Sequence, residues 1–286
     1  MNGVPDLIVI DLDGTLLCPR GQVSESNRRA LAEARGAGVR IMIATGRTHV
    51  ECRQILEAID YQGPMVVASG AALIDLPSES TLDRDLMDQD DVVVLSEIMR
   101  DHDCASLILK DRHAVGYDYL IVGSQHLHPV SNWWFDAHGI ACRTADSAEE
   151  DSHPEDTLRI ACIGAPDLMG QAAERVSDRL GQSVSWRHWP AVGREGEVVH
   201  MLEVFGSGVD KWTMVERYAI DQGIPRERVA AIGDGLNDIQ LLRECGFGIA
   251  VDNADDQVIE AADARTGCHS QDGVADAVDR LLRGWS

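Results

Sequence analysis

The sequence predicts an α/β protein, in which a doubly wound parallel sheet carries an inserted α+β domain. Strand and helix patterns alternate near the N-terminus, and the same alternation returns in the last third of the chain. The segment between them has its own helices and strands. With 286 residues, the chain has room for two domains at roughly 150 residues each. We therefore expect one domain from residues 1–80 and 203–286, and an inserted domain from residues 81–202.

The first part of the chain alternates strand and helix. Short apolar runs rich in β-branched residues are typical of buried parallel strands. Ser24 is a favourable helix N-cap, and the glycines after Arg35 can end the helix that it starts. The expected elements are a strand at Leu7–Ile10, a helix over residues 24–35, a strand at Val39–Ala44, a helix at Thr48–Ile59 and a strand at Met65–Ala68.

The middle of the chain has a different pattern. We expect helices at Asp91–Arg100 and Asp167–Leu180, and a tryptophan-containing loop near Ser131–Gly139. Because these helices and strands do not follow one another as regular βα repeats, the pattern favours an α+β domain. The strand-like runs are Ser106–Lys110, Ala114–Tyr119, Leu158–Ile163, Val184–Trp189 and Val198–Val204.

The βα alternation returns near residue 209 and completes the first sheet. Two further apolar runs are typical of buried strands, and polar helical patterns separate them. The strands are expected at Val229–Ile232 and Phe247–Val251, and the helices at Val209–Gln222, Leu236–Glu244, Asp255–Asp263 and Gly273–Leu282.

The charge balance excludes two classes of partner. Acidic residues outnumber basic ones by 48 to 25, which gives a formal net charge of −23. Proteins that bind nucleic acids or anionic lipids carry basic patches, so neither kind of partner is expected. No apolar run approaches the roughly 20 residues of a membrane span, and the N-terminus lacks the pattern of a signal peptide. The expected location is therefore the cytoplasm.

The seven cysteines are scattered, and no two of them form a CxxC pair. Their odd number and wide spacing favour neither a disulfide framework nor a thiolate zinc site. We expect most of them to be small buried apolar residues.

The strongest chemical signal is the segment Asp11–Leu17, DLDGTLL, directly after the first strand. Ligands of open α/β sheets bind at the carboxyl ends of the strands. Asp11 and Asp13 share one side of an extended segment, where two carboxylates repel each other unless a proton or cation relieves them. Mg²⁺ prefers such oxygen ligands. A DxDG sequence alone is also compatible with an acidic turn.

Two weaker signals involve groups that can bind phosphate. Thr45 and Gly46 follow the second strand, where a hydroxyl and helix N-terminal amides can hold a phosphate oxygen. The same pair is common in helix caps. Lys211 is one of only two lysines in the chain, with Lys110, and lies near the start of a helix. It can neutralise a phosphoryl group, or it can be a solvated helix residue. Substitution of Lys110 is expected to have little effect.

The segment Gly233–Asp238, GDGLND, again places carboxylates between a strand and a helix. Asp234 can complete a metal site with Asp11. Asp238, one turn into the helix, can ligate the metal through water. GDG alone is a common turn, but GDGxND after an apolar strand is more specific.

Together these segments resemble the haloacid-dehalogenase-like hydrolase superfamily. DLDGTLL, ATGR, the lysine and GDGLNDIQLL occur in the order typical of that family, and Gly248–Ala254 is similar to its GIAMGNA-type segment. About 30 residues separate Thr15 from Thr45, whereas about 160 separate Arg47 from Lys211. This spacing resembles the Cof-like sugar-phosphatase branch, subfamily IIB, whose C2-type cap is inserted between the second and third motifs.

One departure from that branch is visible. Where the branch often carries an Asn-Gly pair, this chain has Ser69-Gly70. The departure affects the substrate-orienting role of the position and leaves the core chemistry unchanged.

The resemblance implies a Mg²⁺-dependent phosphatase that acts on small phosphate monoesters, expected to be sugar phosphates. Asp11 would attack phosphorus and form an aspartyl-phosphate. Asp13 would protonate the leaving group and then deprotonate the hydrolytic water. Thr45, Gly46, Lys211 and Asn237 would hold the phosphoryl oxygens. Mg²⁺ would bind the Asp11 carboxylate, the Asp13 backbone carbonyl and Asp234, with Asp238 behind them.

The inserted cap is expected to select the substrate, a small phosphorylated metabolite. The main candidates are Arg187, His188 and Trp133, and the wider set adds Trp134, His138 and Trp189. The tryptophans can equally belong to the cap core, and the basic residues can lie on its surface. The sequence leaves the oligomeric state open.

Two other functions are compatible with the same motifs. A phosphomutase, as in the phosphomannomutases, would keep this core and cap but would phosphorylate a second sugar hydroxyl in place of water. A non-catalytic phospho-acceptor protein would need neither Asp13 nor a cap. Incubation with a hexose phosphate distinguishes the first alternative, because a phosphomutase would form an isomer and a phosphatase would release free phosphate. Phosphate release from p-nitrophenyl phosphate would exclude the second alternative.

Overall fold

A computed structural model describes residues 3–193 and 196–285, and the chain divides into two compact units. The core unit comprises the chain up to Asp83 and from Asp210 onwards, and the inserted unit comprises Arg84–Val209. The sequence suggests boundaries at residues 80 and 202, which fall inside two strands of the structure. Apolar periodicity locates a strand, but it does not reveal at which residue the contacts pass from one unit to the other.

The core unit contains an eight-stranded sheet with the order β14-β13-β12-β1-β2-β3-β4-β5. The pairs from β14 to β3 are parallel, and β3 pairs with β4 in the antiparallel direction. The strands are β1 (Leu7–Ile10), β2 (Arg40–Ala44), β3 (Pro64–Val67), β4 (Ala72–Asp75), β5 (Ser80–Arg84), β12 (Val229–Gly233), β13 (Phe247–Val251) and β14 (Ala264–Thr266).

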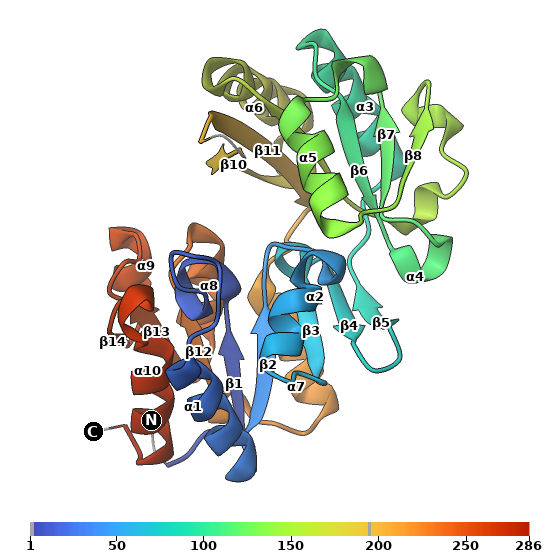
Figure 1. The fold of residues 1–286 in the computed structure, drawn as a ribbon. Coiled ribbons are helices and arrows are strands. Elements are labelled where there is room, and N and C mark those ends of the chain that lie inside the picture. The colour runs from blue at the N-terminus through green and yellow to red at the C-terminus, as the bar shows by residue number, and fades with distance from the viewer. Residues whose placement is uncertain (1–2, 194–195, 286) are drawn as a thin grey trace. The chain divides into compact units, whose positions relative to one another are not determined.

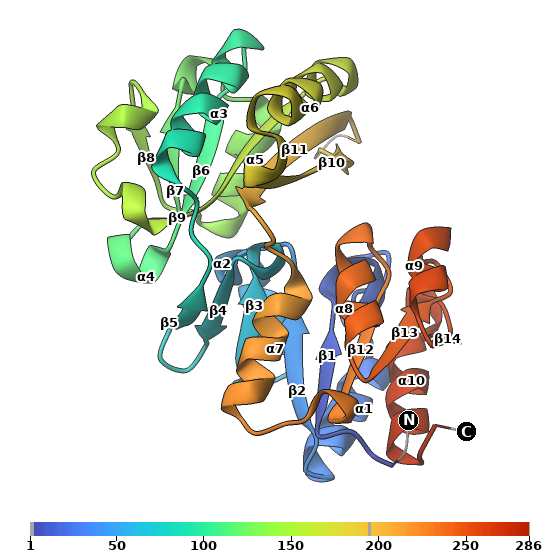
Figure 2. The ribbon, with the colours of Figure 1, turned by 180° about the vertical axis from the view of Figure 1, so that it is seen from behind.

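Helices cover both faces of this sheet, as the prediction of a doubly wound fold requires. Helices α1 and α10 lie side by side on the face seen in Figure 1. Helices α7 and α8 lie on the opposite face, seen in Figure 2. The helices of the core unit are α1 (Glu25–Gly36), α2 (His49–Ala58), α7 (Lys211–Asp221), α8 (Ile239–Glu244), α9 (Asp256–Ala261) and α10 (Gly273–Leu282).

The central strands of the core unit are buried on both faces. All four residues of β1 are buried and apolar. The core beside it contains Met42 and Val66 from the neighbouring strands and Met214 and Val215 from α7. Such burial fits strands that are continuous apolar runs in the sequence.

The inserted unit has a six-stranded sheet with the order β10-β11-β9-β6-β7-β8. Its strand pairs are antiparallel except for the parallel pair β7 and β8. The strands are β6 (Ser106–Lys110), β7 (Tyr119–Val122), β8 (Cys142–Ala145), β9 (Thr157–Gly164), β10 (Val184–Val192) and β11 (Val198–Gly206). The helices are α3 (Gln89–Asp101), α4 (Arg112–Val115), α5 (Pro129–His138) and α6 (Pro166–Leu180).

Two predicted elements of this unit are wrong. The predicted strand Ala114–Tyr119 overlaps the short helix α4, which Asp111 caps and Gly116 ends in a left-handed conformation, and the strand β7 begins only at Tyr119. The predicted loop near Ser131–Gly139 is the helix α5. Its first residue is a proline, which is favourable at that position of a helix. Its N-cap is His128, which is a weaker sequence signal for a helix start than serine or aspartate.

None of the helices in the described part of the chain is long and apolar enough to cross a membrane.

Lys110, the second lysine, is buried in the inserted unit. It forms an ion pair with Asp151, whose side chain is also buried. Its Nζ donates further hydrogen bonds to Thr157 Oγ1 at 2.7 Å and to the carbonyl of His153 at 2.9 Å. Burial lowers the pKa of Lys110, although Asp151 opposes this effect. Lys110 therefore has a structural role, and the expectation that its substitution has little effect does not fit these contacts.

We predict that Lys110→Met destabilises the inserted unit by about 3–5 kcal/mol, because it leaves the Asp151 carboxylate buried without its charge partner. Arg179→Met is the control, since the Arg179–Glu97 pair is exposed and should contribute at most about 1 kcal/mol. Urea unfolding followed by tryptophan fluorescence measures both. Equal effects of the two substitutions would contradict the prediction.

Candidate active site

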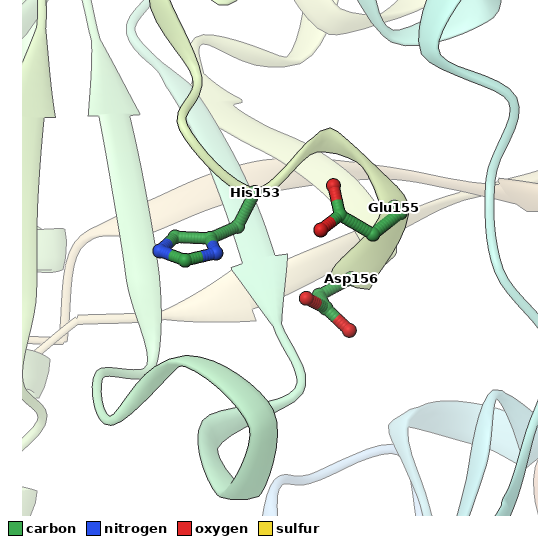
Figure 3. A group of neighbouring side chains, drawn as sticks. All are labelled: His153, Glu155 and Asp156. Carbon is green, nitrogen blue, oxygen red and sulfur yellow. The ribbon is translucent and has the colours of Figure 1, made fainter.

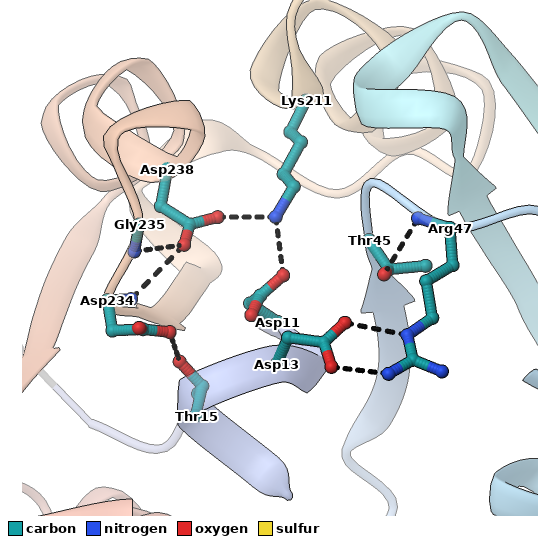
Figure 4. A network of polar contacts seen from close by, with 9 residues as sticks. All are labelled: Asp11, Asp13, Thr15, Thr45, Arg47, Lys211, Asp234, Gly235 and Asp238. Carbon is teal, nitrogen blue, oxygen red and sulfur yellow. Dashed lines mark hydrogen bonds and ion pairs between the residues drawn. The ribbon is translucent and has the colours of Figure 1, made fainter. Parts of the chain in front are cut away.

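The candidate site lies where β1, β2 and β12 end. Asp11 follows β1, and its backbone N–H donates to the carbonyl of Ile232 in β12 at 3.0 Å. Thr45 follows β2, and Asp234 follows β12. Because these strands are parallel neighbours, their carboxyl ends meet at one edge of the sheet. Lys211, the first residue of α7, reaches the same place (Figure 4).

Three carboxylates form an acidic group at this edge. Asp11, Asp234 and Asp238 each offer one oxygen, and these oxygens lie within 4.8 Å of one another. Asp11 and Asp238 are buried, and Asp234 is partly buried. The sequence predicts all three as metal ligands.

Lys211 bridges two members of the acidic group. Its side chain is fully buried, and Nζ lies 2.6 Å from Asp11 Oδ1 and 2.6 Å from Asp238 Oδ1. Burial alone would lower the pKa of Lys211, but the charges of Asp11 and Asp238 outweigh it and raise this pKa to about 12. The lysine therefore stays charged at neutral pH and neutralises only one of the three carboxylates.

The remaining negative charge is unfavourable in this environment. Burial raises the pKa of Asp11 well above its ordinary value, and the charges of Asp238 and Asp234 act in the same direction, whereas Lys211 opposes them. Burial also raises the pKa of Asp234 to about 6, although the hydroxyl of Thr15 opposes this effect. Such shifts indicate that the group accommodates a proton or a cation.

Local hydrogen bonds orient the acidic group and leave two oxygens open. Asp238 Oδ2 accepts the backbone N–H groups of Asp234 and Gly235 at 3.1 and 3.0 Å. The hydroxyl of Thr15 donates to Asp234 Oδ1 at 2.5 Å. Within the described residues, Asp11 Oδ2 and Asp234 Oδ2 accept no hydrogen bond. These hard oxygen donors fit a divalent cation such as Mg²⁺.

Gly14 allows the close packing of this group. Its φ is +79°, and an added Cβ would overlap the carboxylate of Asp234. Only glycine fits a left-handed position with so little space.

Asp13 lies apart from the acidic group. Its carboxylate forms a two-point contact with Arg47, at 2.7 Å from Nε to Oδ2 and 2.6 Å from Nη2 to Oδ1. The Asp13 side chain is 54% exposed. The two aspartates of the DxD motif therefore have different environments, one buried against Lys211 and one exposed beside Arg47.

The predicted phosphate-binding residues also converge. Thr45 is buried, and its Oγ1 accepts the backbone N–H of Arg47 at 3.2 Å. A Cβ added to Gly46 would lie 3.2 Å from Ser69 Oγ and 3.8 Å from Asn237 Nδ2. Ser69, which departs from the family pattern, therefore lies beside the same glycine, and it holds a left-handed φ of +57°.

The candidates of the inserted unit do not form one cluster. Arg187 and His188 are consecutive residues of β10 and therefore point to opposite faces of the sheet. The Arg187 guanidinium lies 5.0 Å from the ring of Phe205. His188 Nε2 lies 2.7 Å from Nδ1 of His200. The side chains of Arg187 and His188 therefore have different surroundings.

The aromatic candidates pack largely against one another. Trp133 and Trp134 of α5 make an edge contact with ring centroids 5.8 Å apart, and Trp134 lies 4.1 Å from the ring of His138. Trp189 of β10 donates its Nε1–H to Glu203 Oε2 at 3.1 Å.

A second group of possible ligands lies in the inserted unit, at His153, Glu155 and Asp156 (Figure 3). Asp156 Oδ1 accepts a hydrogen bond from Arg84 at 2.5 Å. A guanidinium already neutralises this carboxylate, and Glu155 is exposed. We therefore assign no ligand to this group.

Sequence reasoning missed the contacts of two side chains. Arg47 ends the ATGR segment and Thr15 follows the DxDG sequence, so both stand within recognised motifs. Their partners, Asp13 and Asp234, lie 34 and 219 residues away in the chain, and no local pattern reveals such distant pairs.

The raised pKa of Asp234 predicts how stability depends on pH. Its protonated form is favoured in the folded state, so this contribution to stability is lost as the pH rises from about 4 to about 6. In the metal-free protein, the free energy of unfolding should therefore fall between about pH 4 and about pH 6. Asp234→Asn should make this fall smaller by about 2 kcal/mol, after allowance for solvent screening.

Thermal unfolding in EDTA between pH 4 and pH 8 measures this effect. Asp252→Asn, at an exposed pair with Arg265, is the control and should retain the wild-type slope. If the unfolding temperature changes with pH in the same way in the wild type and in both variants, Asp234 is not the cause of the pH dependence.

Comparisons with known proteins agree with this geometry. The model of the haloacid dehalogenase-like hydrolase family matches residues 8–278. The chain is 28% identical over 275 residues to pyridoxal phosphate phosphatase YbhA of Escherichia coli, a match that covers 94% of this chain and 96% of the relative. It is 26% identical to 5-amino-6-(5-phospho-D-ribitylamino)uracil phosphatase YcsE of Bacillus subtilis, over 95% of this chain and 94% of the relative.

A solved structure has the same fold. A haloacid dehalogenase-like hydrolase from Bacteroides thetaiotaomicron superposes with a TM-score of 0.79 at 26% identity, over 97% of this chain and 99% of that one. The family model spans both units, and the relatives match nearly their whole length. The chain therefore belongs to the haloacid dehalogenase-like hydrolase family, in the Cof-like IIB branch of phosphatases.

Proposed function

We propose that this phosphatase hydrolyses small phosphate monoesters through an aspartyl-phosphate on Asp11, with Mg²⁺ as its cofactor. The observation that carries the proposal is the pair of contacts from Lys211 to Asp11 and Asp238 beside an open acidic group. A fixed cation next to a carboxylate nucleophile provides the electrostatic stabilisation that phosphoryl transfer requires.

Asp11 is the nucleophile in this proposal. It is buried, and Lys211 holds one of its oxygens while the other accepts no hydrogen bond within the described residues. The free oxygen, Oδ2, can approach a phosphorus atom. Lys211 would at the same time offset the charge of the incoming phosphoryl group, whose oxygens Thr45, Gly46 and Asn237 would also contact.

Asp13 is the acid and base. Its exposed carboxylate is accessible to a leaving group or to water, and the two contacts from Arg47 fix its orientation. It would give a proton to the leaving oxygen in the first step and take one from water in the second. Arg47 is therefore proposed as its positioning residue.

Asp11, Asp234 and the Asp13 carbonyl would hold Mg²⁺, with Asp238 supporting them. When bound, the ion would offset the charge of the carboxylates and of the phosphate oxygens. The ion and Lys211 together would neutralise the three carboxylates, so a chain with a net charge of −23 could bind an anionic substrate at this site.

The substrate is proposed as a small phosphorylated metabolite. The names of the relatives specify a pyridoxal phosphate phosphatase and a ribitylaminouracil phosphate phosphatase. These substrates extend the expectation beyond sugar phosphates, and a panel of all three classes with Mg²⁺ would identify the preferred one.

We predict that EDTA abolishes phosphate release and that excess Mg²⁺ restores it, because three carboxylates share the single charge of Lys211. Asp234→Asn should raise the Mg²⁺ concentration needed for half-maximal activity by about 10-fold or more. Glu155→Gln, in the second ligand group, is the control and should leave this concentration unchanged. Full activity of the wild type in metal-free buffer would refute the metal requirement.

A second prediction separates the two aspartates. Asp11→Asn should form no phosphoenzyme with any substrate, because it removes the nucleophile. Asp13→Asn should give a burst of nitrophenolate near one equivalent from p-nitrophenyl phosphate, whose leaving group needs no proton, and should then stall because water lacks its base. Rapid-quench kinetics and protein mass spectrometry measure both. Steady wild-type turnover by Asp13→Asn would overturn these roles.

A further inference from the structure

The loop that carries both aspartates is held from outside by three side chains. We call residues Asp11–Leu17 the catalytic loop. Its carbonyl groups at Gly14, Leu16 and Leu17 each accept a hydrogen bond from a side chain of another segment. The donors are Asn253 Nδ2 to Gly14 at 2.8 Å, Asn27 Nδ2 to Leu16 at 3.2 Å and His269 Nδ1 to Leu17 at 2.8 Å. Because a carbonyl cannot donate, Nδ1 of His269 carries the proton.

We call residues 269–275 the C-terminal segment, and both asparagines also bind it. Asn253 Oδ1 accepts the backbone N–H of His269 at 2.9 Å, and Asn27 Oδ1 accepts the backbone N–H of Ala275 at 3.0 Å. Each amide therefore links the catalytic loop to residues 269–275 and uses both its donor and its acceptor. Two bridges of the same kind, from unrelated parts of the chain, end on the same short segment.

The C-terminal segment is itself tightly packed. A Cβ added to Gly273 would overlap the carbonyl of Gly267, and the hydroxyl of Thr266 donates to the carbonyl of Gly273 at 2.7 Å. The segment also leads directly into α10, which lies beside α1. It can therefore act as a fixed support for the loop.

The supported carbonyls flank the reacting groups. Gly14 lies between Asp13 and Thr15, and the hydroxyl of Thr15 donates to Asp234. Holding the Gly14 carbonyl restrains the peptide between Gly14 and Thr15, one residue after Asp13, and so limits how the loop that carries Asp13 and Thr15 can move. An error of about 1 Å in such a position can cost up to about 100-fold in rate.

We infer that Asn27, Asn253 and His269 are positioning residues, through which the C-terminal segment holds the catalytic loop in its reactive geometry. The inference rests on the proposed function, because it assigns these side chains to the acid and base role of Asp13. They act through backbone carbonyls, and within the described residues none of their side-chain hydrogen bonds goes to the acidic group.

The test compares alkyl and aryl substrates in the full chain. Asn253 is exposed and His269 is partly exposed, so Asn253→Ala and His269→Ala should fold, whereas Asn27 is buried and its loss could unfold the core. Both variants should lose about 10-fold or more in the single-turnover rate of the first step with an alkyl phosphate, and clearly less in the nitrophenolate burst from p-nitrophenyl phosphate, whose leaving group needs no proton from Asp13. Steady-state kcat should fall with both substrates, because the second step needs Asp13 as its base. KM should change less than kcat.

His269→Asn is the conservative variant. The asparagine Nδ2 can occupy the place of the histidine Nδ1, so this variant should regain most of the activity that His269→Ala loses. Asn132→Ala, on the exposed face of α5, is the control and should match the wild type.

The outcomes distinguish the two proposals. A parallel loss with both substrates in the rate of the first step, or rates equal to those of Asn132→Ala, would overturn the inference and leave the phosphatase assignment in place. Absence of phosphate release from the wild type and the control with every phosphate monoester would overturn both.

Discussion

The buried ammonium group of Lys211 is the constraint on which the site depends. A lysine without solvent contact must have anionic partners, since an unpaired buried charge costs several kcal/mol. Its two partners lie 200 and 27 residues away in the sequence, one directly after β1 and the other directly before α8. Helix α7 must therefore begin at the carboxyl edge of the sheet. This one charge cannot neutralise all three carboxylates, so the site favours a proton or a further cation.

Much of this arrangement could be predicted from the sequence, because the carboxyl ends of parallel strands meet by geometry. Asp11, Thr45 and Asp234 each follow a short apolar run, and the order of β1, β2 and β12 brings them together. The contact of Asp13 with Arg47 could not be predicted. It depends on the direction in which an exposed side chain leaves a turn, and the apolar pattern carries no information on that direction.

The inserted unit was harder to predict for the same reason. Arg187 and His188 look like one basic pair in the sequence, yet strand alternation separates them. The sequence predicts a loop where the structure has the helix α5, because the aromatic residues there do not show a clear helical period. The sequence predicts little effect from substitution of Lys110, but a buried aspartate in a distant loop determines its role. In each case a tertiary contact outweighs the local signal.

The hydrogen bonds around the acidic group explain how such chemistry can be maintained while the sequence changes. Asp238 is held by backbone N–H groups, and the side chains that hold the catalytic loop bind its backbone carbonyls. Backbone partners are present whatever the neighbouring side chains are, so only a few side chains must be retained. Within the described residues, the hydrogen bonds of Asp11, Asp234 and Asp238 all come from the core unit. The reacting groups can therefore keep their geometry while the inserted unit varies, which fits relatives of about 26–28% identity whose names specify different phosphorylated substrates.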